Sequence, residues 1–316
     1  MNTWKGSVAF VTGGGRGIGL GIARTLAGRG VCLALTDIDE RALHRSAAEL
    51  SRLTDVEPLL LDVRDRAAYA AAADAAEAGL GPVGLLFNNA GIAPHAPVAE
   101  WTYEKWDTAL GVSLDGVVNG LQAFVPRMIE RGGGGYVVNT APGAGLIPHG
   151  SVLYTTGKFA VAELSESLRR ELGPCGIDVN VLCPGPVDTG ILHNTRAVDE
   201  GVAVVRRGQA PGRTEKYLKE GTSIDAAGER VVAAMGAGSL RIDTDAFVRP
   251  ALKARRGPSL HRSPRSKRGR KAQGRAPGSA ESGVSHRVAR FFWNSAATRR
   301  MASSKSTPSR STSACR

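Results

Sequence analysis

The 316-residue chain has no apolar run long enough to cross a bilayer. Its four cysteines show no CxxC spacing, which argues against a cysteine metal site. The N-terminal stretch MNTWKGSVAFVTGGG lacks both the basic segment and the long apolar stretch of a secretory leader. We therefore expect a cytoplasmic protein with neither a membrane nor a metal partner.

Acidic residues are almost missing from the end of the chain. Residues 256–316 hold 15 Lys and Arg residues against one acid, Glu281, whereas residues 1–255 hold 26 basic and 28 acidic residues. The formal net charge of +12 therefore comes from residues 256–316 alone. This segment is rich in Arg, Ser, Gly and Pro and has little to bury, so a disordered basic tail is predicted there.

The tail allows two interpretations. A basic arm would bind nucleic acid through phosphate contacts, whereas an incidental extension would have no function. The boundary near residue 255 is abrupt, and aromatic residues do not recur among the basic ones. Both observations favour the incidental extension.

Residues 7–250 alternate short β-branched or apolar runs with longer Ala- and Leu-rich segments. This is the pattern of βαβ units, whose right-handed crossovers place helices on both faces of a parallel sheet. We predict an α/β fold, a doubly wound parallel sheet of the Rossmann type, in a single domain over residues 1–255. The expected strands are residues 7–12, 31–36, 56–61, 83–87, 135–139 and 177–182, and the expected helices are residues 17–29, 39–52, 65–78, 103–130 and 152–172.

The stretch TGGGRGIG, residues 12–19, lies between the first expected strand and the first expected helix. Glycines at such a turn let the backbone approach a pyrophosphate and present N–H groups at a helix N-terminus. The turn therefore indicates a dinucleotide site. Its expected cofactor contacts are Gly13, Gly15, Arg16, Gly17, Ile18 and Gly19, with Gly13, Gly17 and Gly19 as the principal positions.

Asp37 follows Gly19 by 18 residues and ends the second expected strand. A carboxylate there accepts hydrogen bonds from the ribose hydroxyls of NAD and repels the 2′-phosphate of NADP. NAD is therefore favoured over NADP, although the guanidinium of Arg16 could pair with a 2′-phosphate. Asp39 is expected to be a helix N-cap rather than a ligand contact.

Taken together, these residues resemble the short-chain dehydrogenase/reductase family over about residues 5–250. The turn TGGGRGIG is similar to the family's TGxxxGIG, the stretch NNAG at residues 88–91 matches its NNAG signature, and YTTGK at residues 154–158 matches its YxxxK. The stretch PGPVDT at residues 184–189 resembles the segment that reaches the nicotinamide. By this resemblance the further cofactor contacts are Asp62, Val63, Asn89, Ala90, Gly91, Lys158, Pro184, Gly185, Val187 and Thr189.

The resemblance implies hydride transfer between nicotinamide and an alcohol or carbonyl carbon, with Tyr154 as the acid or base at the substrate oxygen. A free phenol has a pKa near 10, and a nearby cation favours the phenolate. Lys158 lies one helical turn after Tyr154, so it can supply that charge and also hold the ribose. The resemblance also implies that residues 189–227 cover the substrate, and that residues 103–130 and 152–172 join a homodimer or homotetramer.

Two family residues are replaced in this chain. Counting from the strand end VVN, the family's Ser falls at Pro142, which has neither a side-chain donor nor a backbone N–H. The family's helical Asn, in a segment like VNLxGV, corresponds to Ser113 in VSLDGV. Losing one donor to a developing oxyanion typically costs about 10² to 10³ in rate. Candidate substitutes are Ser113 itself, Ser151 and Thr140, and a helix-start role is the favoured interpretation of Ser151.

Two functions follow from these observations. The first is an NAD-dependent oxidoreductase with weakened catalysis, acting on a small alcohol or carbonyl compound. The second is a nucleotide-binding sensor or scaffold that keeps the cleft without efficient turnover. The intact turn, Asp37, Tyr154 and Lys158 favour the oxidoreductase.

Overall fold

The computed structural model describes residues 4–141, 151–198, 216 and 218–244. The predicted boundary at residue 255, the basic tail and Pro142 lie outside these residues. Within them, seven parallel strands form one sheet in the order β3-β2-β1-β4-β5-β6-β7. The strands are β1 (Val8–Thr12), β2 (Cys32–Asp37), β3 (Val56–Leu60), β4 (Val83–Asn88), β5 (Gly135–Thr140), β6 (Ile177–Cys183) and β7 (Arg241–Asp243).

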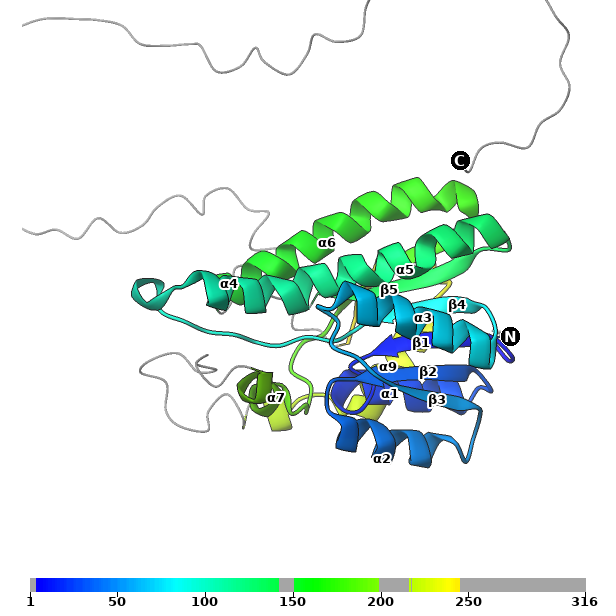
Figure 1. Cartoon of the computed structure of the whole chain (residues 1–316), viewed down its shortest axis with the longest axis horizontal. Coiled ribbons are helices and arrows are strands. Elements are labelled where there is room, and N and C mark those ends of the chain that lie inside the picture. Colours follow the sequence, from blue (N-terminus) through cyan, green and yellow to red (C-terminus); the bar gives the residue numbers. More distant parts are fainter. Residues whose placement is uncertain (1–3, 142–150, 199–215, 217, 245–316) are drawn as a thin grey trace, which may run out of the picture. The chain divides into compact units, whose positions relative to one another are not determined.

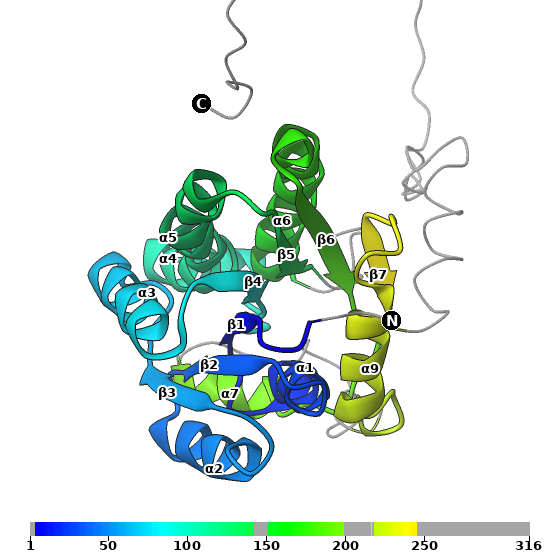
Figure 2. The ribbon, with the colours of Figure 1, turned by 90° about the vertical axis from the view of Figure 1, so that its right-hand side faces the viewer.

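Helices cover both faces of the sheet (Figures 1 and 2). One face carries α3 (Arg66–Leu80), α5 (Gly116–Arg131) and α6 (Val152–Leu172), and the other carries α1 (Gly17–Ala27), α2 (Glu40–Leu50) and α9 (Ile224–Ala234). Each face has its own apolar core, in which the strand side chains pack against these helices. The predicted doubly wound parallel sheet is therefore confirmed.

The strands form from continuous apolar runs because both faces of the sheet are covered. All five residues of β1 are buried, as expected for a central parallel strand. Side-chain oxygens begin several of the helices: Asp39 accepts from the backbone N–H of Ala42 at the start of α2, and Asp65 accepts from those of Ala67 and Ala68 at the start of α3. The N-cap interpretation of Asp39 is confirmed.

The expected helix over residues 103–130 is found, but it is not regular throughout. It consists of α4 (Tyr103–Leu110), a π-helical turn (Gly111–Asp115) and α5, which follow one another without a break. The sequence interpretation also missed three elements, namely α7 (Ile191–Val198), α9 and β7. No helix in the described residues is both long enough and apolar enough to span a bilayer.

Helix α9 crosses α1 at the point where each helix carries a glycine. A Cβ on Gly21 would overlap the carbonyl oxygen of Ile224, and a Cβ on Gly228 would overlap the carbonyl oxygen of Gly21. The two backbones therefore touch with no side chain between them. Because α1 begins at the glycine-rich turn, its close packing on α9 also stabilises the position of that turn.

Candidate active site

The glycine-rich turn lies at the carboxyl end of β1, where α1 begins. Gly13 and Gly17 have positive φ values of 64° and 56°, a conformation that side-chain-bearing residues rarely adopt. A Cβ on Gly19 would overlap the carbonyl oxygen of Gly13, so the first helical turn closes directly against the loop. These three principal positions, with Gly15, Arg16 and Ile18 among them, form one compact turn at a helix N-terminus.

The hydroxyl of Thr12 joins this turn to the NNAG segment. Its Oγ1 accepts hydrogen bonds from the backbone N–H groups of Asn89 and Ala90, each at 3.0 Å, and donates to the carbonyl oxygen of Phe87 at 3.3 Å. The side-chain amide of Asn89 donates to the carbonyl oxygens of Thr12 and Gly13. The two family-like motifs are therefore locked together at adjacent strand ends.

Asp37 is buried at the end of β2, beside the turn. One carboxylate oxygen accepts from the backbone N–H of Gly15 and the other from that of Asp39, both at 3.0 Å. Ser46 of α2 donates to the carbonyl oxygen of Gly15 at 2.8 Å. The backbone of Gly15 and Asp39 thus fixes the orientation of the Asp37 carboxylate. Each carboxylate oxygen still has a lone pair that can accept from a further donor.

Arg16 does not stand free beside the turn. Its guanidinium pairs with the carboxylate of Asp39 and donates from Nη1 to Oδ1 of Asn194 at 2.9 Å. The pKa of Asp39 is lowered, first by the hydrogen bond from the backbone of Ala42 and then by the charge of Arg16. A 2′-phosphate would have to compete with Asp39 for this guanidinium.

Asp62, the adenine-side acid implied by the family resemblance, is clamped by a neighbouring arginine. Both of its carboxylate oxygens accept from the guanidinium of Arg64, at 2.6 to 3.0 Å, and the same arginine holds the pKa of Asp62 below its usual range. Val63 is buried, and its carbonyl oxygen accepts from the side chain of Asn119 at 2.8 Å. A ligand donor at Asp62 would therefore share the carboxylate with Arg64.

Tyr154 and Lys158 both lie in the first two turns of α6. The Lys158 side chain is buried, with 3% of its surface exposed, and its Nζ donates to the carbonyl oxygen of Thr140 at 3.1 Å. A Cβ on Gly91 would lie 3.3 Å from that Nζ, so the ammonium group lies against the end of the NNAG segment. Lys158 thus connects α6 with the ends of β4 and β5.

Burial shifts the pKa of each side chain in the direction that favours its neutral form. It lowers the pKa of Lys158 to about 8 and raises the pKa of the half-buried Tyr154 phenol above its usual value. At neutral pH the lysine is therefore still mostly an ammonium and the tyrosine a neutral phenol. Among the described residues burial alone shifts the pKa of Tyr154, so the lowering expected from Lys158 is not seen there.

The candidate substitute donors are differently placed. Ser151 is the N-cap of α6, and its hydroxyl donates to the carbonyl oxygen of Pro94 at 2.6 Å, in keeping with a helix-start role. The hydroxyl of Thr140 donates to Oδ1 of Asn89 at 3.4 Å. Ser113 is fully buried in the π-helical turn, and its hydroxyl has no hydrogen-bond partner among the described residues.

The PG segment follows β6 and passes the glycine-rich turn. A Cβ on Gly17 would lie 3.3 Å from Cγ2 of Thr189, which places the end of this segment against the turn. The backbone N–H of Gly185 donates to the hydroxyl of Thr244, and the buried Val187 pairs with Thr222 in an isolated parallel bridge. Pro184 and Gly185 thus leave β6 close to the ends of β5 and β7, whose strands flank it.

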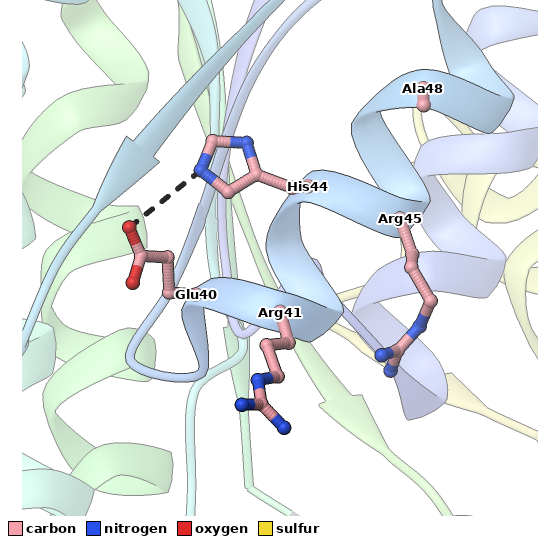
Figure 3. Close-up of a pocket in the computed structure, with 5 residues that line it drawn as sticks. All are labelled: Glu40, Arg41, His44, Arg45 and Ala48. Carbon is pink, nitrogen blue, oxygen red and sulfur yellow. Dashed lines mark ion pairs between the residues drawn. The ribbon is translucent and has the colours of Figure 1, made fainter.

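A shallow hollow lies on the outer face of α2, just beyond Asp39 (Figure 3). It is lined by Glu40, Arg41, His44, Arg45 and Ala48, and Nε2 of His44 lies 4.0 Å from Oε1 of Glu40 one helical turn earlier. All of these side chains come from one exposed helix. No second element of the described part of the chain lines the hollow, so the glycine-rich turn is the better place for a dinucleotide.

Four side chains at this site escaped the sequence interpretation. Thr12 opens the TGGGRGIG stretch, so its position at a strand end was an available signal. Arg64 lies only two residues after Asp62, so their closeness in the sequence was a signal as well. Asn194 and Thr195 carried no local signal, because their partners Arg16 and Ala93 become neighbours only through the fold.

Comparison with known proteins gives a consistent result. Residues 7–200 match the family model described as short chain dehydrogenase. The C alpha-dehydrogenase of Sphingobium sp. is 37% identical over 201 residues, which are 62% of this chain and 65% of the relative. A protein of Mycobacterium tuberculosis named probable oxidoreductase EphD is 38% identical over 209 residues, but these are only 35% of its length. The chain therefore spans less than two thirds of these curated relatives.

A solved structure shares both the fold and the sequence pattern. The short-chain dehydrogenase/reductase from Burkholderia phymatum, in complex with NAD, has a TM-score of 0.72 to this chain at 31% identity. The similarity covers 83% of this chain and 100% of that one. The similarity therefore covers a larger share of this chain than the family model does.

Proposed function

Since the chain belongs to the short-chain dehydrogenase family, we propose that it is an NAD-dependent oxidoreductase acting on a small alcohol or carbonyl compound. The observation that carries the proposal is the position of Lys158. Its buried Nζ lies between the carbonyl oxygen of Thr140 and Gly91, one helical turn from Tyr154. A buried ammonium is costly, so its retention beside a tyrosine and a dinucleotide turn points to a chemical role.

The residues present suit a dinucleotide. Gly13 and Gly19 pack against each other with no space for a side chain. Because no side chain covers the N-terminus of α1 at this point, a pyrophosphate can approach its backbone N–H groups. Asp37 is oriented by two backbone N–H groups and can accept from ribose hydroxyls. Members of this family bind NAD(H) or NADP(H). NAD is the proposed partner here because Asp37 repels a 2′-phosphate and Asp39 already holds the guanidinium of Arg16.

In the proposed reaction, the side chains of Tyr154 and Lys158 provide the proton that the substrate oxygen receives. Bound nicotinamide would supply or accept the hydride. The neutral phenol of Tyr154 can donate a proton to a substrate oxygen, which suits carbonyl reduction at neutral pH. Lys158, as an ammonium, would favour the phenolate left behind and so assist the donation.

Catalysis is proposed to be weaker than the scaffold would allow. Pro142 brings no hydroxyl to the substrate oxygen, and the hydroxyl of Ser151 already donates to Pro94. The hydroxyl of Thr140 likewise donates to Asn89. These contacts favour, as the second candidate function, a nucleotide-binding sensor or scaffold with little turnover. The loss of one such donor corresponds to a rate reduction of about 10² to 10³.

Steady-state turnover with a panel of carbonyls and alcohols tests the first proposal, with NADH and NADPH compared in parallel. Tyr154→Phe should abolish turnover and leave NADH binding, measured by fluorescence, within about twofold, because only the acid is lost. Pro142→Ser should raise turnover. A parent chain that binds NADH, turns nothing over and gains activity only with Pro142→Ser would favour the sensor or scaffold instead.

The cofactor preference has its own test. Asp37→Ser removes the carboxylate and keeps a hydroxyl acceptor, so we expect the ratio of NADPH to NADH affinity to rise by at least about tenfold. Equal ratios in the parent and in Asp37→Ser would contradict the assignment of Asp37 as the discriminating residue.

We further propose a homodimer or homotetramer built on α5 and α6, as the family resemblance implies. Light scattering on the full chain measures its mass directly. A monomer at micromolar concentration would contradict this proposal without touching the proposed chemistry.

A further inference from the structure

Helix α7 follows the PG segment, and its last residue, Val198, packs against the apolar core. Two polar side chains attach it further. The hydroxyl of Thr195 is fully buried, donates to the carbonyl oxygen of Ile191 at 2.7 Å and accepts from the backbone N–H of Ala93 at 2.9 Å. Asn194, the preceding residue, accepts from the guanidinium of Arg16 at 2.9 Å. These two polar contacts hold the helix to the segment after NNAG and to the glycine-rich turn.

The second of these points involves a side chain with two partners. Arg16 is the residue immediately before α1, and its guanidinium binds Asp39 through one amino group and Asn194 through the other. Asp39 in turn donates its backbone N–H to the carboxylate of Asp37. One arginine thus connects the proposed ribose-binding carboxylate, by way of Asp39, to α7.

The geometry points to Asn194 as a positioning residue: through Arg16 it holds α7 against the cofactor turn and transmits nucleotide occupancy of that turn to the helix. A nucleotide that contacts Asp37 and the turn restricts Arg16, and a restricted Arg16 is a better anchor for Asn194. By linkage, any stabilisation of α7 by nucleotide is matched by tighter nucleotide binding when α7 is in place. The transmission rests on the proposed nucleotide site, whereas the anchoring of α7 does not.

Alanine at residue 194 gives a clean test because alanine has a higher helix propensity than asparagine. If helix propensity alone decided the stability of α7, Asn194→Ala would slow hydrogen exchange of its amides. If the Arg16 contact decides it, exchange becomes faster. The loss of one hydrogen bond to a charged group corresponds to exchange about tenfold faster, since about 1.4 kcal/mol is a factor of ten.

The experiment is hydrogen exchange measured by mass spectrometry on the peptide that contains residues 191–198, in the full chain, with and without saturating NADH. Asn194→Asp keeps an acceptor oxygen for Arg16 and should rescue the parent pattern. His193→Ala is the matched control, because His193 is an exposed neighbour on the same helix. In the parent, in Asn194→Asp and in His193→Ala, NADH should slow exchange of this peptide; in Asn194→Ala it should not.

Two outcomes would overturn the inference. Exchange in Asn194→Ala equal to or slower than in the parent without nucleotide would show that Arg16 does not anchor α7. Protection by NADH that persists in Asn194→Ala would show that the signal does not pass through Asn194. If NADH does not bind the parent chain, the proposed function fails and the claimed transmission with it, while the comparison without nucleotide still decides the anchoring of α7.

Discussion

Replacing Thr12 with valine should loosen the joint between the two motifs that form the cofactor site. Thr12 is buried, with 1% of its surface exposed, and its hydroxyl makes three hydrogen bonds. Valine has nearly the same shape but neither donates nor accepts. The backbone N–H of Ala90 would then lose its acceptor among the described residues, whereas that of Asn89 would keep its hydrogen bond to the carbonyl oxygen of Phe87 at 3.0 Å.

The magnitude follows from the N–H group of Ala90. Leaving a buried donor unsatisfied costs about 1–3 kcal/mol, and we take the lower part of this range because Ala90 is half-buried. The valine variant should therefore lose about 1–2 kcal/mol of stability. This is a large share of the about 5–15 kcal/mol by which a typical domain is stable.

Urea unfolding of the full chain, followed by circular dichroism, measures the effect. Thr12→Ser is the matched control, because it keeps the hydroxyl and loses one methyl group, at a cost of about 1 kcal/mol. We expect the valine variant to be less stable than the serine variant and to bind NADH more weakly. If valine is instead as stable as the parent while serine is destabilised, the methyl group and not the hydroxyl holds this joint, and the reasoning is refuted.

Three further changes test other parts of the protein. Burial lowers the pKa of Lys158 to about 8 from an ordinary value of 10.5. Between these two pH values the unfolded state binds more protons than the folded state, so the free energy of unfolding should rise with pH. Urea unfolding from about pH 7 to about pH 10 should show this rise in the parent relative to Lys158→Met. Gly228→Ala should cost about 1–3 kcal/mol by calorimetry, despite the better helix propensity of alanine, because its Cβ would overlap the carbonyl oxygen of Gly21. Asp39→Ala should lose about 1 kcal/mol of helix-capping stability, which Asp39→Ser retains. Both variants should raise the affinity for NADPH, measured by fluorescence, because both release the guanidinium of Arg16 from the carboxylate of Asp39.

The sheet was predictable because its strands are buried on both faces. Stretches such as VAFVT and CLALTD are almost wholly apolar, and the structure buries every residue of the first and all but Cys32 of the second. Strand ends agree with the prediction to within about one residue. Parallel strands enclosed by helices leave a continuous apolar run, and its short length, between turn residues, distinguishes it from a buried helix.

The elements that were missed depend on contacts made by distant residues. The π-helical turn at Gly111–Asp115 adds one residue to a helix without changing its composition, so its sequence looks like uninterrupted helix. Its place is set from outside: a Cβ on Gly111 would lie 3.3 Å from Cδ of Arg64, and one on Gly116 would lie 2.7 Å from Cγ2 of Val63. Strand β7 is only three residues long and pairs with β6 alone, too short to leave a periodic pattern.

The candidate site also has a part that was predictable from the sequence and a part that was not. The motifs that the sequence singled out do meet, because parallel strands bring their carboxyl ends to one edge of the sheet. The partners of the charged residues were not predictable, since Arg16 and Asn194 are 178 positions apart. The sequence therefore indicated where a nucleotide would bind, but not that Arg16 is already engaged.

The packing around Ser113 bears on whether the family's helical asparagine could be restored there. Ser113 is buried in the π-helical turn, and its hydroxyl has no partner in the part of the chain that the structure describes, an arrangement that costs about 1–3 kcal/mol. A Cβ on the facing Gly157 would lie only 3.0 Å from Cβ of Ser113. Gly157 therefore allows α6 to pack closely on this turn. An asparagine at residue 113 would need space that this close packing has removed. A gain in turnover from Pro142→Ser alone would therefore show that the missing hydroxyl, rather than the replaced asparagine, limits the reaction.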